Sequence, residues 1–305
     1  MTTIKKFSGI IPALITPFKQ NGDLDEERLR GVVQDLLHEN IGGLYLTGST
    51  GECFLMTDEE RNRTIEIVAE EVRGRVPLIA HVGDVGTRKS IELAKQAERL
   101  GVDAISSVPP FYWRFTEDEL YGYYRDLAGS TSLPFIIYNI QLAGLLQFQL
   151  LQKLAKLPNV CGIKYTATTH YEINLLKNKL GQDFQVFSGC DEMGLSGLMF
   201  GADGLIGSFY NLMPELYVAI CNAVAAKQID LAAKLQRDAD LVIALALQYC
   251  YVSVIKIAMG WKGVDGGYCR APFINSHAHE DELKEKFRIL RDENQITGVK
   301  FLEQL

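Results

Sequence analysis

The sequence predicts an α/β protein of the (β/α)8 TIM-barrel class with extra C-terminal helices. Eight apolar runs of strand length recur through residue 209, and amphipathic helical patterns lie between them. This alternation is typical of βαβ units, and eight such units close a barrel. An open doubly wound sheet is the alternative fold. If it bound a dinucleotide, it would need a G-x-G-x-x-G turn after its first strand, and residues 16–22 lack that motif.

The eight apolar runs are the expected strands. In chain order they are Gly9–Phe18, Gly43–Thr47, Leu78–Val82, Ala104–Val108, Phe135–Ile140, Val160–Thr166, Gln185–Ser188 and Gly204–Phe209. The start of the chain has the basic-then-apolar look of a secretory segment. Pro12 and Pro17 interrupt its apolar part and no small-residue cleavage site follows, so a first strand is the better interpretation.

Helix-start signals occur between the expected strands. Residues 57–60 and 116–119 each read Thr, two residues, Glu, which fits a capping box. Pro214 suits the first turn of another helix. After about residue 226 clear strand-like runs end, and helical patterns cover Ala232–Met259 and Glu280–Asn294. We therefore expect a barrel over residues 1–225 and a helical extension over residues 226–305 that packs on it.

Composition excludes several classes of function. The chain is 47% hydrophobic and 23% charged, as in ordinary globular proteins. A net charge of −7 without a sizeable basic cluster argues against nucleic acid as a partner. No apolar run reaches the roughly 18–20 residues of a membrane span. The six cysteines form no C-x-x-C pair, so we expect free thiols and a cytoplasmic location.

Lys164 lies inside the apolar run Val160–Thr166, where a lysine needs a physical reason to be buried. An ordinary lysine amine is only about 0.04% neutral at pH 7, and burial lowers its pKa by up to about 3–5 units. A lysine so placed can act as a nucleophile. The alternative is a lysine whose stem packs in the core while its ammonium reaches water.

Other expected strand ends carry polar groups as well, which matters because barrel active sites lie at the carboxyl ends of strands. The loop Gly48-Ser49-Thr50-Gly51-Glu52 can cradle a carboxylate or phosphate with N–H groups and hydroxyls, or be an ordinary glycine-rich turn. Tyr138 could exchange protons through a hydroxyl such as that of Ser49, or be a core tyrosine. Asp191-Glu192 could accept hydrogen bonds from hydroxyls or begin a helix, and Ser208 could join this rim.

These groups together suit imine chemistry on a 2-oxo acid, in which the lysine attacks the ketone and the iminium withdraws electrons. This chemistry needs no metal cluster. His277 and His279 precede two acidic residues and could imitate a metal site, but a solvated polar loop is the better interpretation.

The motifs resemble those of the pyruvate-dependent class I aldolases, the N-acetylneuraminate lyase and dihydrodipicolinate synthase superfamily. The resemblance rests on Gly48-Ser49-Thr50-Gly51-Glu52, Tyr138-Asn139 and Gly162-Ile163-Lys164, in that order. It spans nearly the whole chain and implies a (β/α)8 barrel, commonly a homotetramer, without a cofactor. It also implies Lys164 as the Schiff-base lysine, Tyr138 as the acid/base, and Ser49, Thr50 and Gly51 as binders of the pyruvate carboxylate. Tyr112 would complete a hydroxyl relay, in some members from a partner subunit.

Within the superfamily, the chain looks more like the N-acetylneuraminate lyase branch. The segments 79–83 and 189–192 carry this likeness, and it implies sialic acid and pyruvate as small-molecule ligands. Contacts to the sugar-derived chain would come from Thr166, Gly189, Asp191, Glu192 and Ser208. No arginine occurs between Arg125 and Arg237, although a second carboxylate, as in the synthase branch, is best held by a bidentate guanidinium.

Two positions depart from the family pattern. Gln141 stands where the motif Tyr-Asn-x-Pro has proline, so the loop after Tyr138-Asn139 lacks that fixed φ angle. Trp113 stands where lyases often have tyrosine. The alternatives are another aldolase or dehydratase of the superfamily, such as one acting on a 2-keto-3-deoxy sugar acid, and a non-catalytic barrel that binds a small anion.

Overall fold

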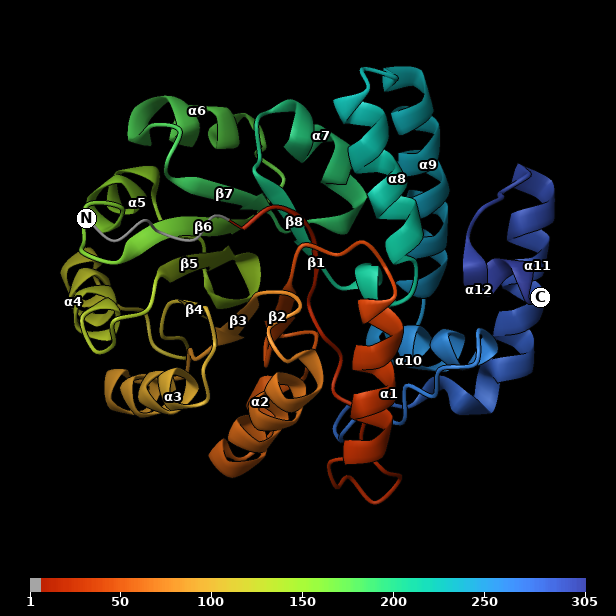
Figure 1. The fold of residues 1–305 in the computed structure, drawn as a ribbon, viewed down its shortest axis with the longest axis horizontal. Helices are drawn as coiled ribbons and strands as arrows, with labels where there is room; N and C mark the ends of the chain where they lie inside the picture. Colours follow the sequence, from red (N-terminus) through yellow and green to blue (C-terminus); the bar gives the residue numbers. More distant parts are fainter. Residues whose placement is uncertain (1–6) are drawn as a thin grey trace.

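Eight parallel strands form one sheet that closes on itself in the computed structural model, which describes residues 7–305 (Figure 1). The strand order is β1-β8-β7-β6-β5-β4-β3-β2, so sequential strands are neighbours. Ala13, just after β1, pairs with Tyr45 of β2, and the Leu14 N–H donates to the Tyr45 carbonyl at 2.8 Å. This contact joins the two ends of the sheet. The predicted barrel is confirmed, and the open sheet is wrong.

The strands are short and lie where the apolar runs predict them. They are β1 (Gly9–Pro12), β2 (Leu44–Leu46), β3 (Leu78–His81), β4 (Ala104–Ser107), β5 (Phe135–Ile140), β6 (Val160–Thr166), β7 (Gln185–Ser188) and β8 (Gly204–Gly207). β1 ends at Pro12, six residues before the predicted Phe18. Ala13 and Leu14 still donate to carbonyls of β8 and β2, and the pairing with strands stops at Ile15, whose N–H donates to the Asn211 side chain. β8 ends two residues early, because the Ser208 and Phe209 N–H groups donate to the Asp191 carboxylate.

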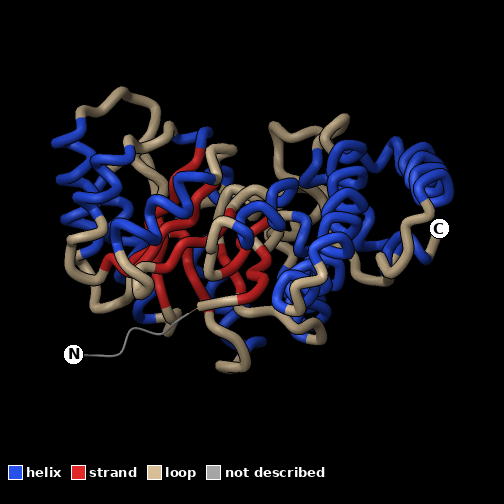
Figure 2. The backbone as a smooth tube through the Cα atoms, turned by 90° about the horizontal axis from the view of Figure 1, so that it is seen from above, coloured by secondary structure: helices blue, strands red, loops and turns tan. Residues whose placement is uncertain are grey.

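Helices surround the barrel and link successive strands (Figures 1 and 2). They are α1 (Glu26–Leu37), α2 (Asp58–Val72), α3 (Thr87–Arg99), α4 (Glu117–Ala128), α5 (Phe148–Leu154), α6 (Tyr171–Leu180), α7 (Gly194–Met199) and α8 (Pro214–Ala225). Both capping boxes are confirmed: Thr57 exchanges hydrogen bonds with Glu60 before α2, and Thr116 does so with Glu119 before α4. Pro214 opens α8, as predicted.

The C-terminal helices pack beside the barrel, on the cyan-to-blue side of Figure 1. They are α9 (Ile229–Ala246), α10 (Tyr251–Trp261), α11 (Glu280–Asn294) and α12 (Lys300–Glu303). The predicted helical stretch 232–259 is broken after Ala246, and the axes of α9 and α10 differ by 114°. No single helix within residues 7–305 is long and apolar enough to cross a membrane; α9 and α10 meet that test only as a bent pair, by length and composition. The boundary at residues 225 and 226 falls between α8 and α9, and the two-part division stays a prediction.

Two apolar layers build the core. The larger layer lies between the strands and the helices, and a smaller one fills the barrel interior with residues such as Ile11, Ile79, Ile136 and Phe187. Alternate residues of a strand point to opposite faces, so each strand contributes to both layers. The buried polar residues Thr47, His81 and Ser188 lie at or directly after the carboxyl ends of β2, β3 and β7.

Candidate active site

Lys164 projects into the barrel interior from β6, beside Tyr138 of β5. The two residues are in register on neighbouring strands, and the Lys164 Nζ lies 4.1 Å from the centre of the Tyr138 ring. Lys164 is only 3% exposed, so the alternative in which its ammonium reaches water is wrong. Burial lowers the pKa of Lys164 to about 8, while the Asp191 carboxyl opposes that shift. Roughly a tenth of the amine is then neutral at pH 7.

Tyr138 is buried among aromatic rings and hydroxyls. Its ring meets the rings of Tyr45 and His81 edge-on, with centroids 5.8 Å and 5.9 Å away. Burial raises the pKa of Tyr138, whereas the Ser49 hydroxyl, and to a lesser extent that of Thr166, lowers it. Tyr138 and Ser49 are therefore brought together as the sequence predicts.

The loop between β2 and the 3-10 turn Cys53–Leu55 is shaped by close backbone approaches. A Cβ on Gly48 would lie 2.7 Å from the Tyr45 ring, and one on Gly51 would lie 2.9 Å from a backbone carbonyl oxygen, so only glycine fits at both positions without a shift. The Thr50 hydroxyl lies 2.7 Å from that of Ser208. Because a single 3-10 turn follows, an anion here would rely on N–H groups and hydroxyls rather than on a helix dipole.

A cavity of about 440 Å³ opens beside this loop. It is largely apolar, and its walls include Ser49, Phe111, Ile140 and Tyr251. A second cavity of about 170 Å³ shares the Tyr251 wall. All five residues predicted to contact a sugar-derived chain line it, namely Thr166, Gly189, Asp191, Glu192 and Ser208.

Asp191 is the buried acid of the smaller cavity. Its Oδ2 accepts hydrogen bonds from the N–H groups of Ser208 and Phe209 at 2.9 Å and 3.0 Å, while Oδ1 is buried without a partner. Burial raises the pKa of Asp191 to about 7, and the Phe209 N–H opposes that shift. The Thr166 hydroxyl oxygen is likewise buried without a hydrogen-bond partner of normal geometry. Both oxygens can therefore bind hydroxyl groups.

Close packing around these oxygens requires two glycines. A Cβ on Gly189 would lie 1.9 Å from the Thr166 hydroxyl oxygen, and one on Gly207 would lie 1.6 Å from Asp191 Oδ1. Cys190, between these residues, has its pKa raised to about 12 by burial. It is therefore a protonated thiol at neutral pH, and such a thiol is a poor nucleophile.

The dihydrodipicolinate synthetase family model matches residues 6–292 of this chain. The chain belongs to that family. A curated N-acetylneuraminate lyase of Escherichia coli (strain SMS-3-5 / SECEC) is 40% identical over 269 residues, covering 87% of this chain and 90% of the relative. Another, from Rhizobium meliloti (strain 1021), is 36% identical over 270 residues, covering 88% and 90%.

Solved structures of this family superpose closely. The Ruminococcus gnavus sialic acid aldolase is similar with a TM-score of 0.90 and 32% identity, covering 95% of this chain and 99% of that one. CdNal from Clostridium difficile, in complex with mannosamine, has a TM-score of 0.90 and 31% identity, covering 94% and 99%. YagE of E. coli K12, in complex with pyruvate, has a TM-score of 0.88 and 27% identity, covering 94% and 99%.

Gln141, which departs from the family pattern, begins an exposed 3-10 turn after β5. The buried Asn139 side chain accepts a hydrogen bond from the Leu146 N–H at 2.9 Å. This bond closes the loop across residues 140–145. A side-chain tie thus constrains the loop where the family motif uses a proline ring.

Tyr112 is the predicted catalytic residue that this chain does not bring to the others. Its side chain is 84% exposed, and it lies outside both cavities. Its φ of 87° is unusual for a residue other than glycine. The ring packs edge-on against Trp113, which is also exposed, with ring centres 4.8 Å apart. Tyr112 therefore faces away from Tyr138 within the chain.

Tyr251 is a site residue that the sequence analysis missed. From the sequence, the segment 249–251 is most simply interpreted as core or subunit-contact surface. The break between α9 and α10 places Tyr251 at the start of α10, where it lines both cavities and stacks on Phe209. No motif marks this position. A tyrosine directly after a break in a helical pattern is the one signal that could have found it.

The expected polar loop around His277 and His279 is a short 3-10 helix (Ser276–His279). The His277 ring stacks on Tyr268, and His279 lies 3.4 Å from the Glu282 carboxylate. Within residues 7–305, no three or more His, Cys, Asp or Glu side chains gather as a metal site.

Proposed function

We propose that the protein is an N-acetylneuraminate lyase, which cleaves sialic acid reversibly to N-acetylmannosamine and pyruvate. The observation that carries this proposal is the position of the Lys164 amine against the Tyr138 phenol, next to a cavity lined by Asp191, Glu192 and Thr166. The curated lyases at 36% and 40% identity support the same activity.

The reaction begins with Lys164. Its neutral amine adds to the keto carbon C2 of open-chain sialic acid, and loss of water gives an iminium. The lowered pKa of Lys164 supplies the neutral amine that this step needs. The Ser49, Thr50 and Gly51 loop holds the adjacent carboxylate with hydroxyls and N–H groups.

Tyr138 then removes the proton of the C4 hydroxyl. The C3–C4 bond breaks, C4 becomes the aldehyde carbon of N-acetylmannosamine, and the electron pair passes into the iminium to form an enamine. Burial raises the pKa of Tyr138, so the resting group is a phenol. A fixed positive charge on the Lys164 nitrogen, 4.1 Å from the ring centre, favours the phenolate in the imine complex. Protonation of C3 and hydrolysis release pyruvate and the free amine.

The smaller cavity selects the sugar. The unpartnered oxygens of Asp191 and Thr166 accept hydrogen bonds from substrate hydroxyls, and Glu192 and Ser208 extend this rim. Such groups suit a polyhydroxylated chain better than a second carboxylate, which an arginine would hold.

Assembly and location belong to the same proposal. We infer a cytoplasmic homotetramer that binds neither nucleic acid nor membranes. Tyr112, Leu142 and Ile274 are each more than 80% exposed, and large apolar side chains so exposed often mark subunit contacts. In such an assembly Tyr112 contributes its hydroxyl to a relay with Ser49 and Tyr138.

Reduction with borohydride in the presence of pyruvate tests the imine. We expect a covalent adduct on Lys164 by peptide mass mapping and none in the Lys164→Ala variant. Lys177 and Lys256 are internal controls, because both are buried but paired with carboxylates. An adduct that survives Lys164→Ala would refute the assignment.

Substrate identity needs a second assay, in which pyruvate release is compared across N-acetylneuraminate and 2-keto-3-deoxy sugar acids. We expect the highest kcat/KM for N-acetylneuraminate. If only the sugar acids released pyruvate, the protein would still be a pyruvate-dependent aldolase, but the assignment as an N-acetylneuraminate lyase would be wrong.

A further inference from the structure

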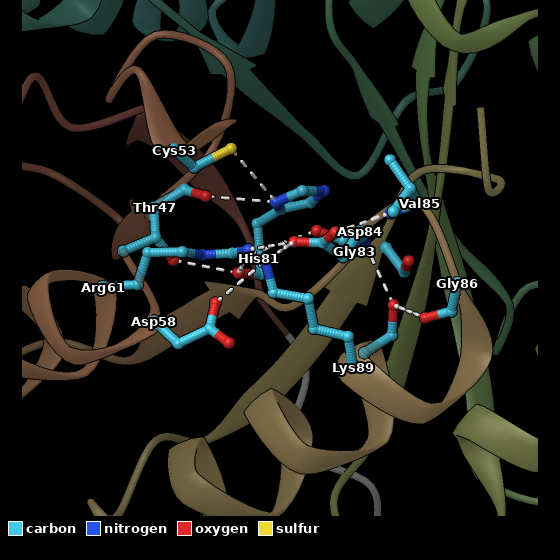
Figure 3. Close-up of polar contacts among 12 residues, drawn as sticks. Thr47, Cys53, Asp58, Arg61, His81, Gly83, Asp84, Val85, Gly86 and Lys89 are labelled. Atoms are coloured by element: carbon cyan, nitrogen blue, oxygen red, sulfur yellow. Dashed lines mark hydrogen bonds and ion pairs between the residues drawn. The ribbon is translucent and has the colours of Figure 1, made fainter. Parts of the chain in front are cut away.

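His81 is the last residue of β3 and contacts Thr47 and Cys53, which lie on either side of the proposed carboxylate-binding loop. The residue is 1% exposed, and its ring meets the Tyr138 ring edge-on at an interplanar angle of 89°. Its contacts reach Thr47 at the end of β2 (Figure 3) and Val108 at the end of β4.

His81 and Thr47 are joined by two hydrogen bonds in opposite directions. The His81 Nδ1 lies 3.0 Å from the Thr47 carbonyl oxygen, which only accepts, so Nδ1 carries a proton and donates. The Thr47 hydroxyl donates to the His81 carbonyl at 2.9 Å. Figure 3 shows both contacts side by side.

Thr47 needs this support because its backbone is strained. Its φ is 50°, in the left-handed region, and a β-branched residue is rarely found there. Thr47 opens the loop that carries Ser49 and Thr50. A change in its conformation would therefore move both hydroxyls relative to Tyr138 and Lys164.

The other side of the imidazole is held as well. The Val108 N–H donates to His81 Nε2 at 3.4 Å, so this nitrogen is an acceptor and the ring is neutral. Burial and the Arg61 charge lower the pKa of His81, which keeps it neutral. Arg61 donates to the His81 carbonyl at 2.9 Å and pairs with Asp84 (Figure 3).

Cys53 lies 3.7 Å from His81 Nδ1, which raises the question of a cysteine–histidine nucleophile. Burial raises the pKa of Cys53 to about 11, and its side chain is 1% exposed. A thiolate paired with an imidazolium does not form under these conditions. The contact is therefore structural.

We propose that His81 is a positioning residue, which holds Thr47 in its left-handed conformation and so sets the Ser49-Thr50 hydroxyls against Lys164 and Tyr138. The inference deepens the proposed function, because it assigns a role in binding the pyruvate carboxylate. His81 itself does not touch the reacting atoms.

Two substitutions separate the contacts of His81. In His81→Asn the amide nitrogen is attached to Cγ, as Nδ1 is, so the donor to Thr47 is kept. In His81→Gln the amide lies farther out, near the position of Nε2, so that donor is lost. We expect half-maximal reductive trapping at an unchanged pyruvate concentration in the Asn variant and at an about tenfold higher one in the Gln variant, a loss typical of one buried hydrogen bond.

Thr47→Gly tests the strain directly, because glycine adopts the same φ without strain. In the Thr47→Gly background, His81→Gln should raise the pyruvate concentration needed for half-maximal trapping by less than about threefold. A double-mutant cycle measures this non-additivity. Full additivity would overturn the inference. KM for N-acetylmannosamine should not change in either background.

The matched control lies at the opposite end of the barrel. Gln185 makes a similar reciprocal pair of hydrogen bonds with the Phe7 backbone. Gln185→Met removes both, so it should lower Tm without changing the pyruvate concentration for trapping. An equal effect of Gln185→Met and His81→Gln on that concentration would reduce His81 to a general stabilising role.

Hydrogen exchange gives a readout that needs no activity. In His81→Gln the amides of residues 47–53 should exchange faster than in the unmodified protein, and in His81→Asn they should not. Equal exchange in both variants would overturn the inference even if trapping works. Failure of the unmodified protein to form an adduct would instead reject the proposed function and leave this measurement to decide on His81.

Discussion

At the scale of single residues, burial decides the chemistry of Lys164. A lowered pKa means that the neutral amine appears at lower pH than in an ordinary lysine. With a pKa of about 8, the rate of reductive trapping with pyruvate should rise about tenfold per pH unit below 8 and level off above it. Trapping with cyanoborohydride at several pH values measures the rising limb of this pH–rate profile. A profile whose midpoint lies above pH 10 would contradict the lowered pKa of Lys164.

Asp191 affects the pH at which the trapping rate levels off. Its carboxylate charge raises the pKa of Lys164, opposing burial, so Asp191→Asn should lower that pKa and move the limb to lower pH. The same variant should cleave N-acetylneuraminate more slowly, because the amide cannot accept hydrogen bonds as a carboxylate does. Glu192→Gln is the control, expected to slow cleavage while leaving the limb in place. A limb that moves upward in Asp191→Asn would contradict the assignment.

The sequence makes Lys164, Tyr138 and the Asp191 rim predictable, because each lies within or shortly after an apolar run of strand length. The proposed role of His81 is harder to predict, because it depends on the backbone conformation of Thr47. No sequence pattern indicates a positive φ at a threonine. Tyr251 is equally silent in the sequence. A bend between two helices, rather than a motif, carries it to the cavity.

At the scale of elements, α10 is tied to the barrel through a buried ion pair. The Lys256 Nζ donates to Glu52 at 2.5 Å and to the Thr16 and Tyr268 carbonyls, each at 2.7 Å. Neither side chain of the pair is exposed. One lysine of the C-terminal helices thus holds the loops that follow β1 and β2.

Lys256→Met should therefore destabilise the protein strongly. The substitution leaves the Glu52 charge buried without its partner, which costs about 3–5 kcal/mol. Denaturant unfolding measures this loss. Lys284→Met is the control, because the Lys284–Glu280 pair is partly exposed and should contribute less than about 1 kcal/mol. Similar losses in both variants would contradict this account.

Several element boundaries follow directly from the sequence patterns. β5, β6, β7 and α11 begin and end as the patterns predict. The predicted first and last strands are too long because side chains from distant positions accept the backbone hydrogen bonds there: Asn211 from Ile15, and Asp191 from Ser208 and Phe209. Such long-range acceptors leave no trace in the apolar pattern of the strand itself.

At the scale of the whole molecule, the exposed loop of Tyr112 concerns assembly. If the protein forms the proposed homotetramer and Tyr112 completes the relay there, Tyr112→Phe should lower kcat about a hundredfold, the effect of a lost proton-transfer group. The mass of the Tyr112→Phe variant, measured by light scattering, should stay four times that of a single chain. The control variant Trp113→Phe should keep kcat within a few-fold of the unmodified protein and should keep the same mass. An unchanged kcat in Tyr112→Phe would remove Tyr112 from the site.

Because α9 and α10 bend back to the barrel, residues from two separate parts of the sequence line the smaller cavity. The residues proposed for imine formation lie on the barrel strands, whereas Ile243, Leu247 and Tyr251 of the C-terminal helices line the smaller cavity. Mutations in the tail can therefore alter which aldehyde is accepted while the lysine and its surroundings persist. Libraries confined to these three codons should yield new aldol acceptors from a conserved pyruvate nucleophile, and natural divergence within the family could follow the same route.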